Sequence, residues 1–87
     1  MTAQDKFFEH DGKRITYREA EVLLCCAKGM TSLQTADRLG VCVGTINRHH
    51  ENIRTRFSLK GYHTLTCFAT TLQPELEKMC NVIHQNV

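Results

Sequence analysis

Apolar residues recur at helical spacing along most of the chain, and the first such segment follows Thr16. The Thr16 hydroxyl can accept a hydrogen bond from the Glu19 amide, while the Glu19 carboxylate can accept one from the Thr16 amide. An apolar stripe follows, made of Val22, Leu23, Cys26 and Ala27. Gly29 suits the left-handed residue that ends such a helix. The pattern predicts a helix over about 17–28.

The next two segments predict a pair of helices joined by a short turn. Thr31 can cap a short second helix that stops before Gly40, and this helix is expected to bury Leu33, Ala36 and Leu39. A longer helix is expected over Val43 to Phe57, with Ile46, Ile53 and Phe57 turned inward on one stripe. Three residues separate the two helices, and this layout is typical of a helix-turn-helix.

The two ends of the chain have separate patterns. Residues 1–14 are polar except for Phe7 and Phe8, contain the turn pair Asp11-Gly12 and lack helical periodicity, which predicts a short arm. Its phenylalanines either dock on the core or belong to a partner surface. A fourth helix is expected through Leu65, Phe68, Ala69 and Leu72 until Pro74 interrupts it, and a fifth through Leu76, Met79, Val82 and Ile83. This last helix packs either on its own domain or on a second copy.

The fold class that follows is all-α, with four helices in a helix-turn-helix domain and an additional C-terminal helix. The expected division is an arm over 1–14, a domain over 15–72 and a helical extension over 73–87. With 87 residues, one compact domain is the default, and the 41% hydrophobic and 23% charged fractions are ordinary for a globular chain.

The charge distribution is more informative than the net charge of +2. Residues 1–44 carry equal numbers of acidic and basic side chains, whereas 45–62 carry four basic residues and one acidic residue. This local excess fits either a nucleic-acid contact or a solvated helix face.

Other classes of protein are not favoured. The longest apolar run, 22–27, is too short to span a membrane, and no signal pattern opens the chain, so a cytoplasmic location is expected. Five cysteines without a C-x-x-C pair fit reduced thiols. His49, His50 and the cysteines lack zinc-ligand spacing, and no orienting group for a catalytic Cys-His pair is evident. Capping and local ion pairing explain Arg18, Glu19 and Glu21 better than a catalytic cluster does. We therefore expect neither an enzyme, nor a cofactor, nor a small-molecule ligand.

The segment from Ile15 to Ala69 resembles the LuxR/GerE-type helix-turn-helix family. Its stretches ITYREAEVL, AKGMT, TADRL and TINRHHENIRTRFS match the family pattern in order and spacing. The resemblance implies a DNA-binding domain that usually acts as a dimer on promoter DNA and often contacts RNA polymerase. Because few residues precede Ile15, a free-standing, GerE-like protein is expected.

The resemblance also implies roles for individual residues. Base contacts are expected from Asn47, Arg48 and Glu51, whose groups can pair with adenine, guanine and cytosine respectively. Phosphate contacts are expected from Thr31, Ser32, Thr45, His49, Arg54, Arg56 and Lys60. The two-fold contact is expected from Leu65, Phe68, Leu72, Leu76 and Met79.

Several positions depart from the family pattern. Cys42 replaces a serine cap, and because a thiol caps a helix poorly, the third helix is expected to fray at its start. Asn47 replaces a lysine, Thr35 replaces a core isoleucine, and Leu33-Gln34 replace a polar-acidic pair. Two hypotheses follow: a sequence-specific DNA-binding regulator, or a protein-binding anti-activator or adaptor that keeps the fold and targets another regulator.

Overall fold

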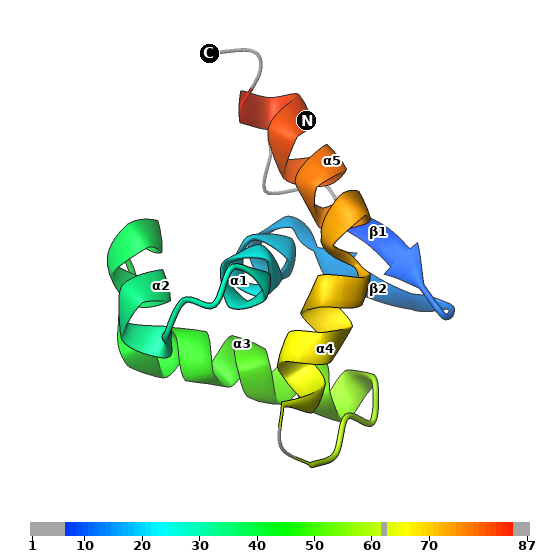
Figure 1. Ribbon diagram of the computed structural model, residues 1–87, viewed down its shortest axis with the longest axis horizontal. Coiled ribbons are helices and arrows are strands. Elements are labelled where there is room, and N and C mark those ends of the chain that lie inside the picture. The colour runs from blue at the N-terminus through cyan, green and yellow to red at the C-terminus, as the bar shows by residue number, and fades with distance from the viewer. Residues whose placement is uncertain (1–6, 62, 85–87) are drawn as a thin grey trace.

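The computed structural model describes residues 7–61 and 63–84, with side chains described as far as Cys80. A hairpin of two strands is followed by five helices (Figure 1). In chain order they are β1 (Phe7–His10), β2 (Lys13–Thr16), α1 (Tyr17–Ala27), α2 (Ser32–Leu39), α3 (Val43–Arg56), α4 (Thr64–Thr71) and α5 (Gln73–His84). The all-α class and the helix-turn-helix layout are confirmed, because the small hairpin is the only strand structure within the described residues.

The segment expected to be an arm contains the β-hairpin, which is a correction to the sequence analysis. Asp11 and Gly12 both have positive φ, 54° and 75°, as a two-residue type I′ turn requires. Phe8 pairs with Ile15 across the strands, and both pack against the main core, whereas Phe7 stays 44% exposed. A search for helical periodicity misses this element because each strand has only four residues and the apolar ones do not alternate with polar ones.

Two clusters of buried side chains hold the helices together. The larger cluster joins β2, α1, α4 and α5 to the end of α3, and its fully buried members include Ile15, Leu23, Ile53 and Leu76. The smaller cluster, Val22, Ala36 and Ile46, joins α1 to α2 and α3. Burying one such aliphatic side chain contributes about 1.5–3 kcal/mol. Helix α1 is therefore the central element against which the helix-turn-helix pair is fixed.

The ends of the first two helices follow the expected local chemistry. Thr16 and Glu19 form both hydrogen bonds of a capping box, at 3.0 and 3.2 Å. Thr31 forms a second capping box with Gln34, a partner that the sequence analysis did not identify. Gly40 ends α2 in the left-handed conformation with φ of 69°. The predicted bounds and caps of these helices are confirmed to within a residue.

The buried face of α2 differs from the expected one at Leu33. Its side chain is 68% exposed, whereas Thr35 is buried at 1% exposure. The Thr35 hydroxyl donates to the Thr31 carbonyl at 2.8 Å, so its polar group is satisfied and its methyl group can face the core. At about 100° per residue, a helix that turns Thr35, Ala36 and Leu39 inward directs Leu33 to solvent.

Helix α5 begins at Gln73, where the helical extension was expected to start, and packs on its own domain. Pro74 lies in its first turn, where the missing amide hydrogen has no intrahelical acceptor in any case. Only Leu72 separates α4 from α5, and the Leu76 amide donates to the Leu72 carbonyl at 2.9 Å. Leu76 and Cys80 are buried in the main cluster. Val82 and Ile83 lie outside the residues whose side chains are described.

Three of the five residues expected at the two-fold contact are buried in the single chain. Leu65, Leu72 and Leu76 are each at most 5% exposed. Phe68 and Met79 are only partly buried and remain accessible. None of the helices in the described part of the chain is long and apolar enough to cross a membrane.

Candidate nucleic-acid interface

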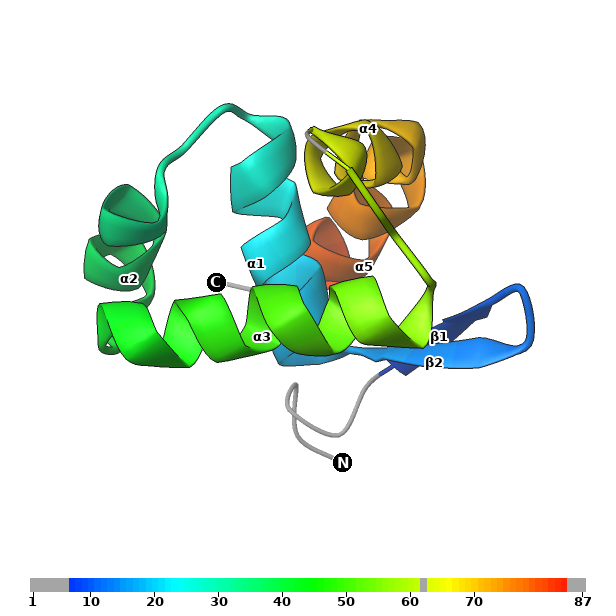
Figure 2. The same cartoon turned by 90° about the horizontal axis from the view of Figure 1, so that it is seen from below.

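Helix α3 lies along the lower edge of the molecule in Figure 2, and most of its exposed residues are polar. Ile46 and Ile53 are fully buried and fix its inner side to α1 and α2. The three residues expected to contact bases, Asn47, Arg48 and Glu51, are all exposed. At about 100° per residue, Arg48 and Glu51 lie roughly 150° from the two isoleucines. The structure thus places these three side chains on the accessible side of one rigid helix.

One of these residues is engaged with a neighbour on the same helix. The Glu51 carboxylate lies 3.7 Å from Arg54, and both side chains are largely exposed. An exposed pair of this kind contributes about 0–1 kcal/mol, so either member can exchange its partner for a nucleotide at small cost. The pair also lowers the net negative charge that Glu51 would otherwise present beside phosphates.

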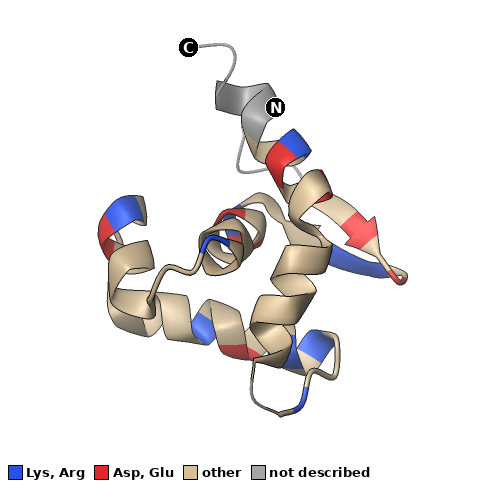
Figure 3. Cartoon of the chain, in the orientation of Figure 1, with Lys and Arg blue, Asp and Glu red and all other residues tan. Residues whose placement is uncertain are grey.

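The residues expected to contact phosphates fall into several groups. Thr31, Ser32 and Arg54 border one groove of about 540 Å³ between the start of α2 and the helices α1, α3 and α4, together with His50. Thr45 is exposed on α3, and Lys60 is exposed in the segment after it. Figure 3 shows that Lys and Arg residues occur along α3 and in the segment that follows its end. The cations are therefore spread along the helix instead of forming one patch.

The two adjacent histidines are partly buried on opposite flanks of α3. Burial lowers the pKa of His49, although the nearby Glu19 carboxylate opposes this effect. Burial also lowers the pKa of His50, and Arg54 lowers it further. The His50 Nε2 atom is buried and has no hydrogen-bond partner among the described residues. Burial thus favours the neutral form of both rings, and a neutral His49 can still donate an N–H to a phosphate.

Arg56 makes contacts that the sequence analysis did not predict. Its Nη1 atom donates to Glu19 Oε1 at 2.6 Å and to the Arg14 carbonyl at 3.0 Å. The end of α3 is thereby bound both to the start of α1 and to the hairpin. Because 37 positions separate Arg56 from Glu19, no local pattern indicates the pair. The guanidinium has a structural role here, and its expected phosphate contact stays a prediction.

The start of α3 lacks a side-chain cap, as the sequence analysis predicted. Cys42 has the extended backbone of an N-cap residue, but its thiol forms no capping hydrogen bond. Replacing Cys42 with serine is expected to raise the free energy of unfolding by about 0.5–1 kcal/mol, since the hydroxyl can accept from the second or third amide of α3.

Urea denaturation measures this effect. Cys67→Ser is the matched control, because Cys67 is also exposed but lies within α4. The control is expected to change stability by less than about 0.5 kcal/mol. Equal changes in the two variants would contradict the capping explanation.

The layout of α2 and α3, the three-residue turn between them and the exposed polar face of α3 define a helix-turn-helix DNA-binding domain. The family model for "Bacterial regulatory proteins, luxR family" (GerE) matches residues 13–69, which is more than half of the chain. The protein belongs to this family of DNA-binding transcription regulators, whose domains are not enzymes. No curated protein and no solved structure gave a significant match.

Proposed function

We propose that the protein is a sequence-specific transcription regulator that inserts α3 into the major groove of duplex DNA. The exposed face of this 14-residue helix carries the proposal, because two fully buried isoleucines on the opposite side hold it in place. A B-DNA major groove is wide enough to admit one α-helix. Since α3 is anchored to the core and not carried on a loop, its side chains can reach base edges in a fixed register.

The base contacts are assigned by donor and acceptor chemistry. Arg48 suits the guanine O6 and N7 acceptors, Asn47 suits adenine, and Glu51 can accept from the cytosine amino group. Thr31, Ser32, Thr45, His49, Arg54 and Lys60 are proposed to contact phosphates. Their hydroxyl, imidazole and cationic groups would set the register of the helix without reading sequence.

A homodimer is the proposed binding form. A two-fold dimer would contact two half-sites separated by about one helical turn, or about 10 base pairs. The residues proposed for the two-fold contact lie on α4, at Leu72 and on α5, and the partly exposed Phe68 and Met79 are the most accessible of them. The other three are Leu65, Leu72 and Leu76. RNA polymerase is a proposed further partner, and the bacterial cytoplasm is the proposed site of action.

A salt titration of duplex binding tests this function. Contacts with several phosphates release counterions, so the affinity of the protein for a selected duplex is expected to fall linearly with salt on a logarithmic scale. The duplex is obtained by selecting bound sequences from a random pool. An enriched palindrome with a steep salt dependence supports the proposal. Negligible duplex binding even at low salt would contradict it.

One observation favours a second candidate, the protein-binding anti-activator or adaptor. Leu33 lies on the first helix of the helix-turn-helix and is the most exposed large hydrophobic side chain among the described residues. Absence of duplex binding together with binding to another regulator would favour this candidate.

A further inference from the structure

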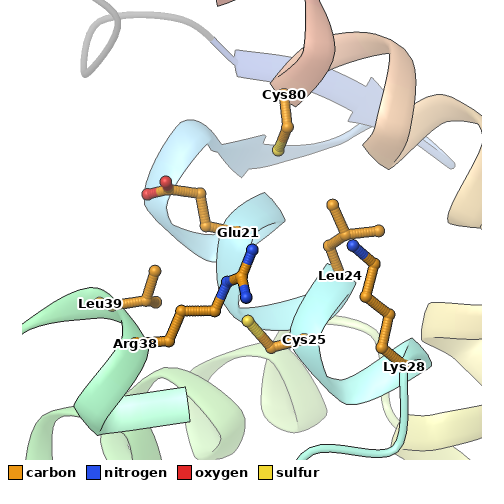
Figure 4. Close-up of a pocket in the computed structure, with 7 residues that line it drawn as sticks. All are labelled: Glu21, Leu24, Cys25, Lys28, Arg38, Leu39 and Cys80. Carbon is orange, nitrogen blue, oxygen red and sulfur yellow. The ribbon is translucent and has the colours of Figure 1, made fainter. Parts of the chain in front are cut away.

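A small pocket lies between α1, α2 and α5, and α3 contributes nothing to it (Figure 4). Its volume is about 270 Å³, slightly below the range usual for sites that bind drug-sized ligands. The pocket is lined by three segments: residues 21–28 at α1 and its end, the end of α2, and the side of α5 that carries Cys80. An occupant would therefore contact the helix-turn-helix and the C-terminal helix at the same time.

The inner wall of the pocket is uncharged. Leu24 and Leu39 contribute aliphatic surface, and Cys25 and Cys80 contribute thiols that are almost fully buried. Burial raises the pKa of Cys25 and raises that of Cys80 to about 11, so both thiols are protonated at neutral pH. Protonated, buried cysteines behave as small apolar side chains. This wall suits a compact aliphatic or aromatic group.

The rim of the pocket carries two cations. Figure 4 shows the side chains of Lys28 and Arg38 extending toward the same space, Lys28 from the end of α1 and Arg38 from α2. Both are close enough to Cys25 to affect its thiol electrostatically. Within the described part of the chain, neither forms a salt bridge. Glu21, the third charged group at the rim, already pairs with Arg18 at 3.3 Å.

We propose that this pocket binds a small organic monoanion: a carboxylate attached to a short apolar group. The carboxylate would lie between the ammonium of Lys28 and the guanidinium of Arg38, which can donate two parallel hydrogen bonds to it. The apolar group would cover Leu24, Leu39 and the two thiols. Glu21 disfavours a second negative charge on the ligand, since its carboxylate borders the same pocket.

This inference goes beyond the proposed function and does not depend on it. Because α3 does not line the pocket, a bound ligand would leave the proposed DNA-binding face open. The ligand would hold the end of α2 against α1 and α5, and any ligand that binds only the folded state raises the thermal midpoint.

Hexanoate is a suitable probe. Hexanol and hexylamine have the same chain length without the carboxylate and serve as reference compounds. The experiment records amide NMR spectra and thermal midpoints of the full chain during titration with each compound. We expect hexanoate to shift amide signals around the pocket and to raise the midpoint, with affinity at least about tenfold above that of hexanol. Hexylamine is expected not to bind. Equal binding of hexanoate and hexanol would overturn the proposal.

Two substitutions locate the site. Arg38→Gln and Lys28→Gln are each expected to weaken hexanoate binding by about tenfold or more, because each removes a charged donor from the rim. Lys13→Gln removes the same charge from the distant hairpin and is the matched control. A well-dispersed amide spectrum verifies that each variant is folded. Unchanged hexanoate affinity in both pocket variants, or equal amide shifts produced by chloride alone, would also overturn the proposal.

Discussion

Replacing Glu19 with alanine is expected to lower the free energy of unfolding by about 3 kcal/mol. The Glu19 side chain is 6% exposed and accepts hydrogen bonds from Arg56 at 2.6 Å and from the Thr16 amide at 3.0 Å. Its removal leaves the guanidinium without its carboxylate and opens the capping box of α1. Because the Arg56 side chain is 31% exposed and can be partly solvated, the loss should lie at the lower end of the range for buried pairs.

A double-mutant cycle separates the ion pair from the cap. Urea denaturation of Glu19→Ala, Arg56→Ala and the double variant gives the coupling energy between the two side chains. We expect a coupling above about 0.5 kcal/mol, the lower bound usual for residues in direct contact. Additive effects of the two substitutions would show that Glu19 acts only through the cap.

The ionisation of Glu19 also predicts how stability depends on pH. Burial alone would raise the pKa of Glu19, but the hydrogen bonds from Arg56 and the Thr16 amide outweigh it, so the pKa lies below its ordinary value. A carboxyl with a lowered pKa stabilises the fold above its unfolded-state pKa of about 4.3, and this contribution is lost as the pH falls further. His49 and His50 act in the same direction at higher pH, because their lowered pKa values oppose protonation below about 6.5.

Denaturation midpoints measured from pH 7 to pH 3 check both contributions. Stability should decline in an early phase through the histidines and a later one through Glu19. In Glu19→Gln, the later decline should be reduced, since the amide does not titrate. If Glu19→Gln lost as much stability at low pH as the unmodified protein, other carboxyl groups would be responsible for that loss.

The sequence predicted those parts of the fold whose causes are local. Helices α1 and α2 begin at capping residues and end near glycines, so their bounds follow from a few neighbouring side chains. The hairpin was missed because its two strands have four residues each and lack the alternation of apolar and polar residues that indicates a strand. Leu33 was misplaced because the hydroxyl of Thr35 finds a backbone acceptor, which allows a polar residue to replace an apolar one in the core.

For the proposed DNA-binding site, the sequence predicted which face of α3 is exposed but not the contacts that depend on tertiary packing. The exposed positions of α3 follow from its periodicity, because the buried isoleucines fix which side faces outward. The contact between Arg56 and Glu19 depends on how α3 crosses α1, and that crossing is set by the packing of the whole core. The same holds for the pocket, whose walls come from helices that only the tertiary structure brings together.

The substitution with the largest expected effect on DNA recognition is Arg48→Ala. A bidentate contact between arginine and guanine discriminates by about 1–3 kcal/mol, so affinity for the selected duplex should fall roughly 5- to 150-fold. Binding to unrelated duplexes should change little, because Arg48 is proposed to read a base and not a phosphate. Arg48 is exposed and belongs to neither cluster of buried side chains, so the variant should give the amide spectrum of a folded domain.

Lys60→Ala is the matched control, because it removes one positive charge at a proposed phosphate contact and leaves the pair of Arg54 with Glu51 intact. It should weaken binding about equally for all sequences and should reduce the salt slope by about one. Arg48→Ala should instead relax the preference at one position of each half-site when sequences are selected again. If both variants lost affinity uniformly, Arg48 would serve only electrostatic attraction. The base-reading role of this helix would then have to rest on Asn47 and Glu51.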